Sequence, residues 1–446
     1  MRTRVSYLIL CLEFSSFSPR STAFSTLERM KHLILISALL SVSVLATAQN
    51  PAPKPASSQA KGKASQATKE AVKPDSKPQI LTLKLLTSEQ RIKGGKLESL
   101  TLAASYPLPK NAVLRSRKYS KISSALEPKL EKLFARLSKR EPRSAYFSNV
   151  KGNWIGQQQT GWKVDAKKTR ENLLEALKKG DSEAKIVLEL TPPKRSVKDF
   201  SERGIVYHFG GGQSSFAGSP EFRVKNILVG ANKIDQRYVE AGDEFDFGAY
   251  VGDIDKKNGF VKGLIISGGT LALEDGGGIC QVSTTIFRAA YLSGLPITER
   301  HEHSHVVHYY DPIGLEATVY TPEKNFKFKN DTAKALFIQA DYDAKKQTLR
   351  FDLFGVKPDR KVTVSKPALS NYQKAAEPSY SADLSVRLGR SRRIDVAERG
   401  VTVNITRRVK LAAGEVRKDN LKSVYKPWGE VFAVNPQDPR AARSAQ

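Results

Sequence analysis

A run of three glycines that leads directly into a helical apolar pattern limits what residues 274–294 can form. The stretch is EDGGGICQVSTTIFRAAYLSG. Three apolar residues recur at helical spacing after the glycines: Val282, Ile286 and Ala289. Gly294, followed by Pro296, is a typical helix stop. The pattern predicts a loop followed by a helix that begins at or near Cys280.

Cys280 is one of only two cysteines, and the other, Cys11, lies upstream of a predicted leader. Met30 opens MKHLILISALLSVSVLATAQ, which has the basic start, short apolar run and small-residue cleavage site of a secretory signal ending at Ala48. Its apolar run is shorter than a membrane span requires, so we expect cleavage and no stable membrane span afterwards. We therefore predict an exported protein of the cell wall, periplasm or extracellular space, in which Cys280 is the only thiol.

Composition narrows the class of partner. The chain has 73 Lys and Arg against 45 Asp and Glu, a net charge of +28, with 8% aromatic residues. No basic stretch is interleaved with aromatic residues that could stack on bases, so we expect no nucleic-acid partner. For an exported protein, anionic wall polymers are the more plausible polyanions.

The remaining patterns predict an α+β multidomain chain. An α+β module is expected from the alternating ILTLKLL and from two helical patterns, SSALEPKLEKLFARLSKR and DAKKTRENLLEALKKG. Short alternating strands such as VTVNITRRVKL predict a small β-rich C-terminal module. The expected segments are an upstream start assigned too early (1–29), a signal peptide (30–48), a disordered basic linker (49–79), an α+β module (80–199), an α+β catalytic domain (200–350) and the β-rich module (351–446).

Cys280 has two possible roles. A free cysteine is commonly a small buried hydrophobic residue. At a helix N-terminus, however, unpaired N–H groups and the dipole lower a thiol pKa, and the same groups can bind an oxyanion. The absence of Cβ atoms at Gly276, Gly277 and Gly278 would let a substrate chain lie against the backbone.

Histidines suited to act as the base follow about twenty residues later, in ERHEHSHVVHYYDPIG. His301, His303 and His305 alternate, so on a strand they would share one face. Zinc binding is a rival interpretation, but tetrahedral sites usually draw ligands from more than one element. We predict no metal and no other cofactor, since a thioester mechanism requires neither.

These motifs resemble the VanW domain family, whose hallmark is GGGxCQxST followed by R-x-x-HS. The likeness covers about residues 206–343, including SSFAGSPEFRVKNI and GLEATVYTPEKNFKFKNDT. Upstream, the chain resembles a peptidoglycan-binding module, and GRSRRIDVAERGVTVNITRRVKLAAGEV is weakly similar to a G5-type module. The family is associated with glycopeptide (vancomycin) resistance clusters, and some members are L,D-transpeptidases.

The resemblance implies roles for individual residues. Cys280 is the expected nucleophile and His303 the expected base, with His301 and His305 left as alternatives. Four further positions are implied in substrate binding, together with Gly276, Gly277 and Gly278: Gln281, Ser304, Arg300 and Glu316. Arg300 would bind a stem-peptide carboxylate, which its planar fork suits. Glu316 stands where the family usually has aspartate.

The sequence thus predicts an enzyme, a cysteine acyltransferase that joins peptidoglycan stem peptides in 3-3 cross-links. The same Cys–His pair with water as acceptor would make an L,D-carboxypeptidase or endopeptidase. A non-catalytic peptidoglycan-binding scaffold is the alternative from another class.

Overall fold

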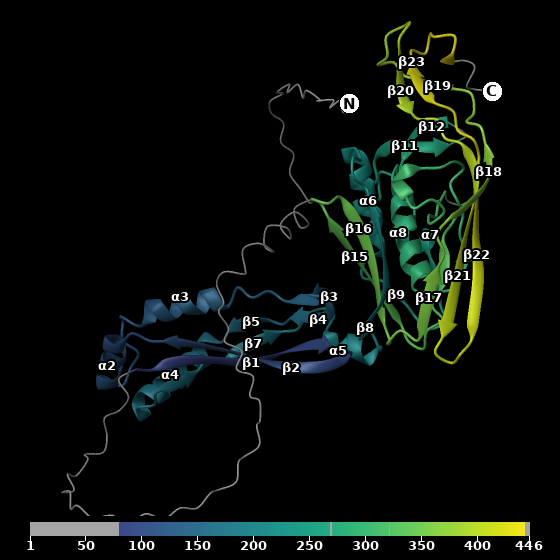
Figure 1. The fold of residues 1–446 in the computed structure, drawn as a ribbon. Helices are drawn as coiled ribbons and strands as arrows, with labels where there is room; N and C mark the ends of the chain where they lie inside the picture. The colour runs from purple at the N-terminus through teal and green to yellow at the C-terminus, as the bar shows by residue number, and fades with distance from the viewer. Residues whose placement is uncertain (1–79, 268–269, 321, 442–446) are drawn as a thin grey trace, which may run out of the picture.

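The structure, a computed structural model, describes residues 80–441 apart from 268–269 and 321. The expected upstream start, signal peptide and linker lie outside these residues. The described chain is an α+β multidomain protein with several separate sheets (Figure 1). No helix in the described part is both long and apolar enough to cross a membrane.

An N-terminal α+β domain extends away from the rest of the molecule (Figure 1). Its main sheet has the order β2-β1-β4-β3, with β6 parallel to β1, and β5 pairs separately with β7. The strands are β1 (Thr82–Lys93), β2 (Lys96–Pro107), β3 (Arg143–Val150), β4 (Asn153–Gln159), β5 (Gly161–Val164), β6 (Glu183–Lys185) and β7 (Leu188–Thr191). The helices are α2 (Lys110–Lys118), α3 (Glu127–Leu137) and α4 (Ala166–Lys179).

Local sequence explains the helices of this domain. Leu130 of α3 and Leu173 of α4 are fully buried in one hydrophobic cluster. The Asp165 carboxylate accepts a hydrogen bond from the Lys168 main-chain N–H and caps α4, whose end is set by Gly180 in the left-handed conformation. Both helical patterns seen in the sequence therefore form helices.

A short joint connects this domain to the central one. Helix α5 (Val197–Glu202) begins at a capping box, and its Phe200 packs in a cluster shared by both domains. The Gln339 side chain donates to the Phe147 carbonyl at 2.9 Å and accepts from the Phe147 N–H at 2.8 Å. The two domains thus share an apolar cluster and are joined by hydrogen bonds between the Gln339 side chain and the Phe147 main chain.

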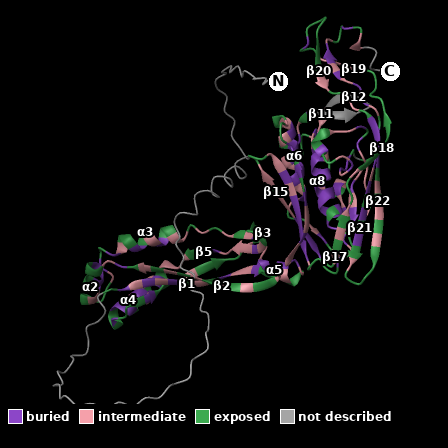
Figure 2. Ribbon diagram, in the orientation of Figure 1, coloured by how far each residue is buried: buried purple, intermediate pink, exposed green. Residues whose placement is uncertain are grey.

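The central domain packs helix α8 (Ile279–Leu292) against a four-stranded antiparallel sheet of order β8-β16-β15-β9. Those strands are β8 (Tyr207–Ser215), β9 (Tyr238–Val239), β15 (Leu336–Asp343) and β16 (Thr348–Gly355). The sheet therefore continues past the expected domain boundary at residue 350. Val282, Ile286 and Ala289 are fully buried, as their spacing requires, and α8 is buried along most of its length (Figure 2).

Smaller elements surround α8. They are α6 (Glu221–Ile234), α7 (Phe247–Val251), the 3₁₀ helix η1 (His308–Tyr310), the hairpin of β11 (Lys262–Ser267) and β12 (Thr270–Asp275), and a sheet of β10 (Glu244–Asp246), β14 (Lys327–Lys329) and β13 (Ile297–Glu299). Residues 301–305 do not form the strand that alternation of the histidines suggested, since β13 ends before them and His301 makes only an isolated bridge with Thr318.

The C-terminal module consists of two small sheets beside the central domain. The first has the order β17-β21-β18 with β22 on β21, and the second β19-β23-β20. The strands are β17 (Arg360–Val364), β18 (Ala368–Gln373), β19 (Ser379–Ala382), β20 (Ser391–Asp395), β21 (Gly400–Leu411), β22 (Val416–Tyr425) and β23 (Val431–Val434). The long β21–β22 hairpin runs along the side of the central domain that contains α8 (Figure 1).

Buried arginines fasten this module to the central domain. Arg407 of β21 donates to the carbonyls of Tyr291 and Leu295, at 2.8 and 3.0 Å, where the last carbonyls of a helix lack intrahelical partners. Its guanidinium also lies over the Tyr291 ring. Arg360 of β17 pairs with Asp331 at 2.7 Å. The module therefore caps the C-terminal end of the helix that begins at the cysteine.

Candidate active site

The glycines before α8 make room for the protein's own side chains. Gly276 and Gly278 have φ of +87° and +111°, which non-glycine residues rarely adopt. A Cβ at Gly278 would lie 2.7 Å from Arg223 Cγ, and one at Gly276 would lie 2.2 Å from Ile254 Cγ2. At these two positions the space that a Cβ would need is occupied by Arg223 and Ile254, whereas the sequence suggested a substrate chain.

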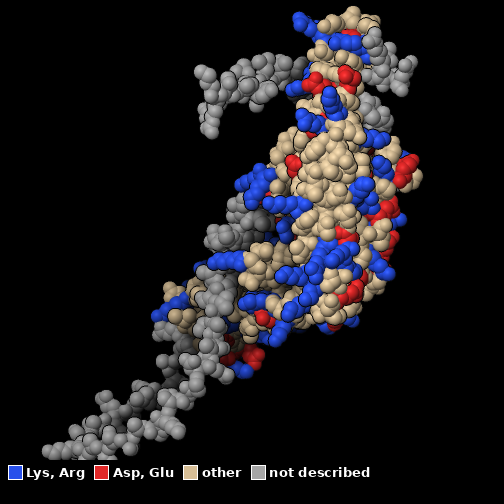
Figure 3. All heavy atoms as spheres, turned by 45° about the vertical axis from the view of Figure 1, so that its right-hand side comes forward, with Lys and Arg blue, Asp and Glu red and all other residues tan. Residues whose placement is uncertain are grey.

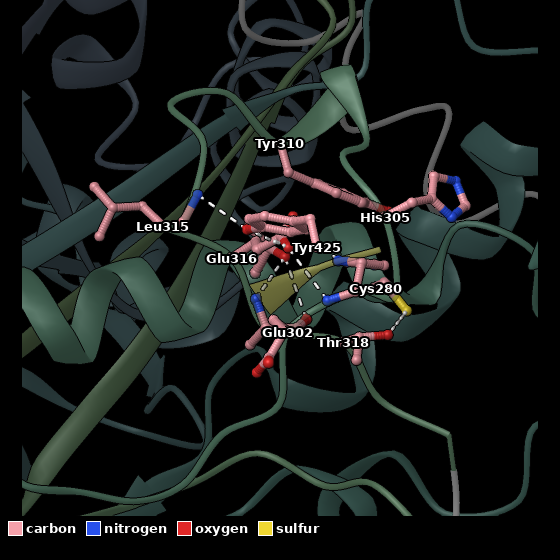
Figure 4. Close-up of polar contacts among 12 residues, drawn as sticks. Cys280, Glu302, His305, Tyr310, Leu315, Glu316, Thr318 and Tyr425 are labelled. Atoms are coloured by element: carbon pink, nitrogen blue, oxygen red, sulfur yellow. Dashed lines mark hydrogen bonds and ion pairs between the residues drawn. The ribbon is translucent and has the colours of Figure 1, made fainter. Parts of the chain in front are cut away.

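Cys280 is the second residue of α8 and is partly exposed to the cavity. Its sulfur lies 3.4 Å from the Thr318 hydroxyl and 3.6 Å from the Val319 carbonyl oxygen. Figure 4 shows the Thr318 hydroxyl directed at the sulfur. The N–H groups on either side of Cys280 already have acceptors, since Ile279 N–H donates to the Gly276 carbonyl at 2.9 Å and Gln281 N–H to the Gly278 carbonyl at 3.0 Å.

Ser283 and Thr284 hydrogen-bond α8 to the segment that contains Thr318. Ser283 donates to the Ala317 carbonyl at 2.6 Å, and the Thr284 hydroxyl accepts from the Ala317 N–H at 3.1 Å. These two bonds place Glu316 and Thr318, the two neighbours of Ala317, beside the start of α8.

His303 is the histidine that lies against the thiol. Its ring lies close enough to Cys280 to lower the pKa of the thiol, and its Nδ1 lies 3.1 Å from Glu316 Oε2. The latter contact is an ion pair rather than a well-aligned hydrogen bond. The His303 ring also stacks on Tyr310, with centroids 4.6 Å apart. Cys280, His303 and Glu316 therefore form one connected row of side chains.

The electrostatics of this row favour a thiolate beside an imidazolium. Burial raises the pKa of the Cys280 thiol, but the hydrogen bond and charge of His303 outweigh burial and lower the pKa. Burial lowers the pKa of His303, whereas the charge of Glu316 and the bond to Cys280 raise it to about 9. Burial also opposes ionisation of Glu316, but the charge of His303 keeps its pKa below the usual range.

The remaining histidines of the cluster have other partners. His301 Nε2 lies 3.1 Å from Glu299, and the exposed His308 lies 2.6 Å from Glu398. The His305 ring stacks on Trp428 at 3.8 Å, and burial together with the charge of His303 lowers its pKa to about 4. The described residues contain no group of three His, Cys, Asp or Glu side chains that could bind a metal ion.

The C-terminal module reaches this row through Tyr425, the last residue of β22. Its hydroxyl donates to Glu316 Oε1 at 2.8 Å and accepts from the Gly314 N–H at 3.1 Å. Both Tyr425 and Glu316 are 2% exposed, and Figure 4 shows them in contact behind the thiol. The carboxylate that orients His303 is thus itself oriented by a residue outside the central domain.

Arg288 of α8 fixes the loop that carries Tyr310 and leads to Glu316. It is buried and donates to the carbonyls of Tyr310 and Leu315, at 2.6 and 2.7 Å. One helix therefore carries the cysteine and orders the segments that supply its partners.

A cavity of about 1420 Å³ opens onto the sulfur. Cys280, His303 and Thr318 line it at the row of side chains described above. The C-terminal module supplies five of its lining residues: Ile394, Asp395, Val396, Glu398 and Trp428. A cavity of this size accommodates a peptide with several side chains.

The sequence-predicted substrate residues fall into two groups. Gly276, Gly278 and Ser304 line the cavity, whereas Gly277, Gln281, Arg300 and Glu316 do not. Gln281 is fully buried and donates to the Ser214 hydroxyl at 2.6 Å.

The location expected for Arg300 requires correction. Its guanidinium lies behind the site and donates to the carbonyls of Glu316 and Gly314, at 2.7 and 3.2 Å. It therefore supports the main chain on either side of Leu315, away from any substrate carboxylate in the cavity.

Four residues beside the site were not singled out from the sequence. They are Arg223, Thr318, Tyr425 and Trp428. Arg223 and Thr318 fall within stretches that carry the family resemblance, SSFAGSPEFRVKNI and GLEATVYTPEKNFKFKNDT, and this was a usable signal. Nothing local distinguishes Tyr425 and Trp428, which reach the site only through tertiary packing.

Comparison with known proteins supports the assignment of the central domain. A family model described as VanW like protein matches residues 222–354. The uncharacterized protein YoaR of Bacillus subtilis (strain 168) is 30% identical over 239 residues, which cover 52% of this chain and 74% of that protein. The chain belongs to the VanW-like family. The vancomycin B-type resistance protein VanW of Enterococcus faecalis (strain ATCC 700802 / V583) is 30% identical over 118 residues, covering 25% of this chain and 42% of that protein.

The residues matched by the VanW-like family model include the three side chains of the row, but not the residues of the C-terminal module that contact the site. Cys280, His303 and Glu316 all lie within the matched residues. Tyr425 and Trp428 lie beyond them. The VanW-like domain of this chain is therefore completed by residues that the family model does not include.

Proposed function

We propose that this VanW-like protein is an exported peptidoglycan L,D-transpeptidase that acts through a Cys280 acyl-enzyme. The observation that supports this most strongly is the row of Cys280, His303 and Glu316 at one wall of a peptide-sized cavity. A thiol with a lowered pKa beside an imidazole oriented by a carboxylate is the arrangement that nucleophilic acyl transfer requires. The family resemblance supplies the substrate class.

In the first step, the Cys280 thiolate attacks the carbonyl carbon of the bond between the donor's diamino acid and its terminal D-residue. The C–S bond forms and the C–N bond breaks, and the leaving amine takes its proton from the His303 imidazolium. We assign stabilisation of the oxyanion to the main-chain N–H of Cys280 in the first turn of α8. The product is a thioester on Cys280 with His303 neutral.

In the second step, the side-chain amine of an acceptor stem attacks the thioester. Neutral His303 takes the proton that the attacking amine loses, the new amide forms, and the thiolate is released. Water in place of the amine would give a carboxypeptidase or endopeptidase at the same site. The acceptor is therefore what distinguishes these outcomes, and no cofactor enters either route.

The wall is also the proposed location of the flanking regions. We assign to the N-terminal domain and the basic charge a role in retention on peptidoglycan or anionic wall polymers. On the face drawn in Figure 3, Lys and Arg side chains are spread along the length of the molecule without a single dense patch. Such a distribution suits adhesion through summed charge.

The test uses the chain from Gln49 onward with tetrapeptide-bearing muropeptides, followed by mass spectrometry. The wild-type protein should form 3-3 dimers with loss of one D-residue per dimer. Cys280→Ala should form none, because no other thiol is present in that chain. Dimers at the wild-type level in Cys280→Ala would refute the proposal, and trimmed monomers alone would establish the hydrolase.

A further inference from the structure

Arg223 of α6 is a buried cation on the wall of the same cavity. It is only 8% exposed and lines the cavity together with Cys280. The mechanism above makes no use of it. An arginine buried to this degree is normally paired with a carboxylate, since an uncompensated buried charge is costly.

The partners of Arg223 within the described chain are all uncharged. Its guanidinium donates to the Ser219 hydroxyl and, at 2.8 Å, to the Gln281 side-chain oxygen. The Tyr309 ring lies under it at 4.0 Å. No Asp or Glu among the described residues forms an ion pair with it. Because arginine has five N–H donors, these contacts leave donors for a ligand.

Three observations place the Arg223 side chain near the Cys280 thiol. Gln281, its hydrogen-bond partner, directly follows Cys280 in α8. Gly278 lacks a Cβ where Arg223 Cγ packs. Arg223 and Cys280 both lie close enough to Tyr310 to influence the pKa of its hydroxyl. The guanidinium and the sulfur therefore occupy one wall of the cavity.

The other charged groups of the cavity are mainly acidic. Among the described residues that line the cavity, only Arg223 and Lys324 carry a permanent positive charge, against seven carboxylates: Asp253, Asp255, Glu274, Asp275, Glu323, Asp395 and Glu398. This contrasts with the net charge of +28 for the whole chain. An anionic group entering the cavity meets repulsion over much of the lining and attraction at Arg223.

We propose that Arg223 is the receptor for the α-carboxylate of the donor's terminal D-residue, beside the bond that Cys280 attacks. A guanidinium binds a carboxylate with two parallel hydrogen bonds, which fixes its orientation as well as its charge. The inference rests on the proposed function for the identity of the donor. On this proposal Arg223, rather than Arg300, selects the donor. The selected donor is a stem peptide with a single residue after the attacked bond.

A pair of alkylating reagents tests the anion site without requiring turnover. Iodoacetate and iodoacetamide attack the same thiolate but differ in the carboxylate. Arg223→Gln should lower the iodoacetate-to-iodoacetamide rate ratio at Cys280 about tenfold relative to the wild type. Arg223→Lys should retain part of the ratio, and the matched control Lys324→Gln, which removes the lysine charge of the cavity, should leave it within about twofold. Equal ratios in the wild type and Arg223→Gln would overturn the proposal.

A second measurement needs no variant and so does not depend on correct folding of Arg223→Gln. N-acetyl-D-alanine should protect wild-type Cys280 from iodoacetamide, and its C-terminal amide at the same concentration should not. Equal protection by acid and amide would also overturn the assignment. Carboxylate discrimination without muropeptide dimers would instead refute the transpeptidase proposal and leave the role of Arg223 intact.

Discussion

The two regions that flank the central domain differ in their relation to the thiol. The N-terminal domain, residues 80–193, contributes no residue to the cavity lining and joins the central domain through contacts such as Gln339 with Phe147. The C-terminal module contributes five lining residues and, through Tyr425, a hydrogen bond to the carboxylate that orients His303. From sequence, both regions were expected to be accessory.

A module that flanks the proposed catalytic domain can therefore supply part of its site, as the C-terminal module does here. The C-terminal module caps the far end of α8 through Arg407 and supports its near end through Tyr425. Changes in this module should therefore alter catalysis itself. Changes in the N-terminal domain should alter only the proposed binding of the protein to the cell wall.

The largest effect within this comparison is expected for Glu316→Gln, which removes the charge that links the C-terminal module to His303. Because the charge of Glu316 raises the pKa of His303 to about 9, its loss should lower that pKa. Turnover needs protonated His303 for the leaving amine, so wild-type kcat/KM should fall as pH rises through about 9. In the variant, kcat/KM should begin to fall at a lower pH. At pH 8 it should be roughly a hundredfold below that of the wild type.

The matched control is Glu89→Gln, which changes the buried carboxylate of the N-terminal domain that pairs with Arg140 at 3.2 Å. Its pH profile should keep the alkaline limb near pH 9, as in the wild type. An unchanged alkaline limb in Glu316→Gln would mean that Glu316 does not set the proton affinity of His303.

A smaller effect is expected for Tyr425→Phe, which deletes only the hydroxyl that donates to Glu316. A hydrogen bond to a charged group contributes about 1.5–3 kcal/mol. We therefore expect kcat to fall roughly tenfold with KM little changed, since Tyr425 does not line the cavity. Steady-state kinetics on muropeptides measures both constants.

Tyr146→Phe supplies the same chemical change in the N-terminal domain, where the hydroxyl accepts from Gln157 on the sheet surface. Its kcat should equal that of the wild type. Similar losses from both substitutions would contradict the distinction between the two flanking regions.

The smallest effect is expected for the charge of the N-terminal domain. Lys167→Gln combined with Lys178→Gln removes two exposed positive charges of α4. Binding to purified sacculi should weaken about twofold to fivefold at low salt and less at high salt, because exposed charges are screened. Turnover of small soluble muropeptides should not change. A change in turnover without a change in binding would place the N-terminal domain in the catalytic machinery.

Local pattern explains why much of the fold could be predicted. The apolar spacing of Val282 and Ile286, with glycines before and after, specified α8, and the Asp165 and Gly180 caps specified α4. Alternation would have placed His301, His303 and His305 on one face of a strand, but residues 301–305 form no strand, because alternation alone does not supply a pairing partner. Strand pairing depends on residues distant in sequence, which periodicity does not reveal.

The amino-acid sequence by itself determined the position of the thiol at a helix start, because helix signals are carried by near neighbours and by the conformational freedom of glycine. Only the tertiary structure decided which histidine meets that thiol, that Arg300 lies behind the site while Arg223 faces the cavity, and that Tyr425 completes the row. Those contacts join residues separated by tens of positions or more, such as Glu316 and Tyr425. They exist only once packing has brought the separate elements together.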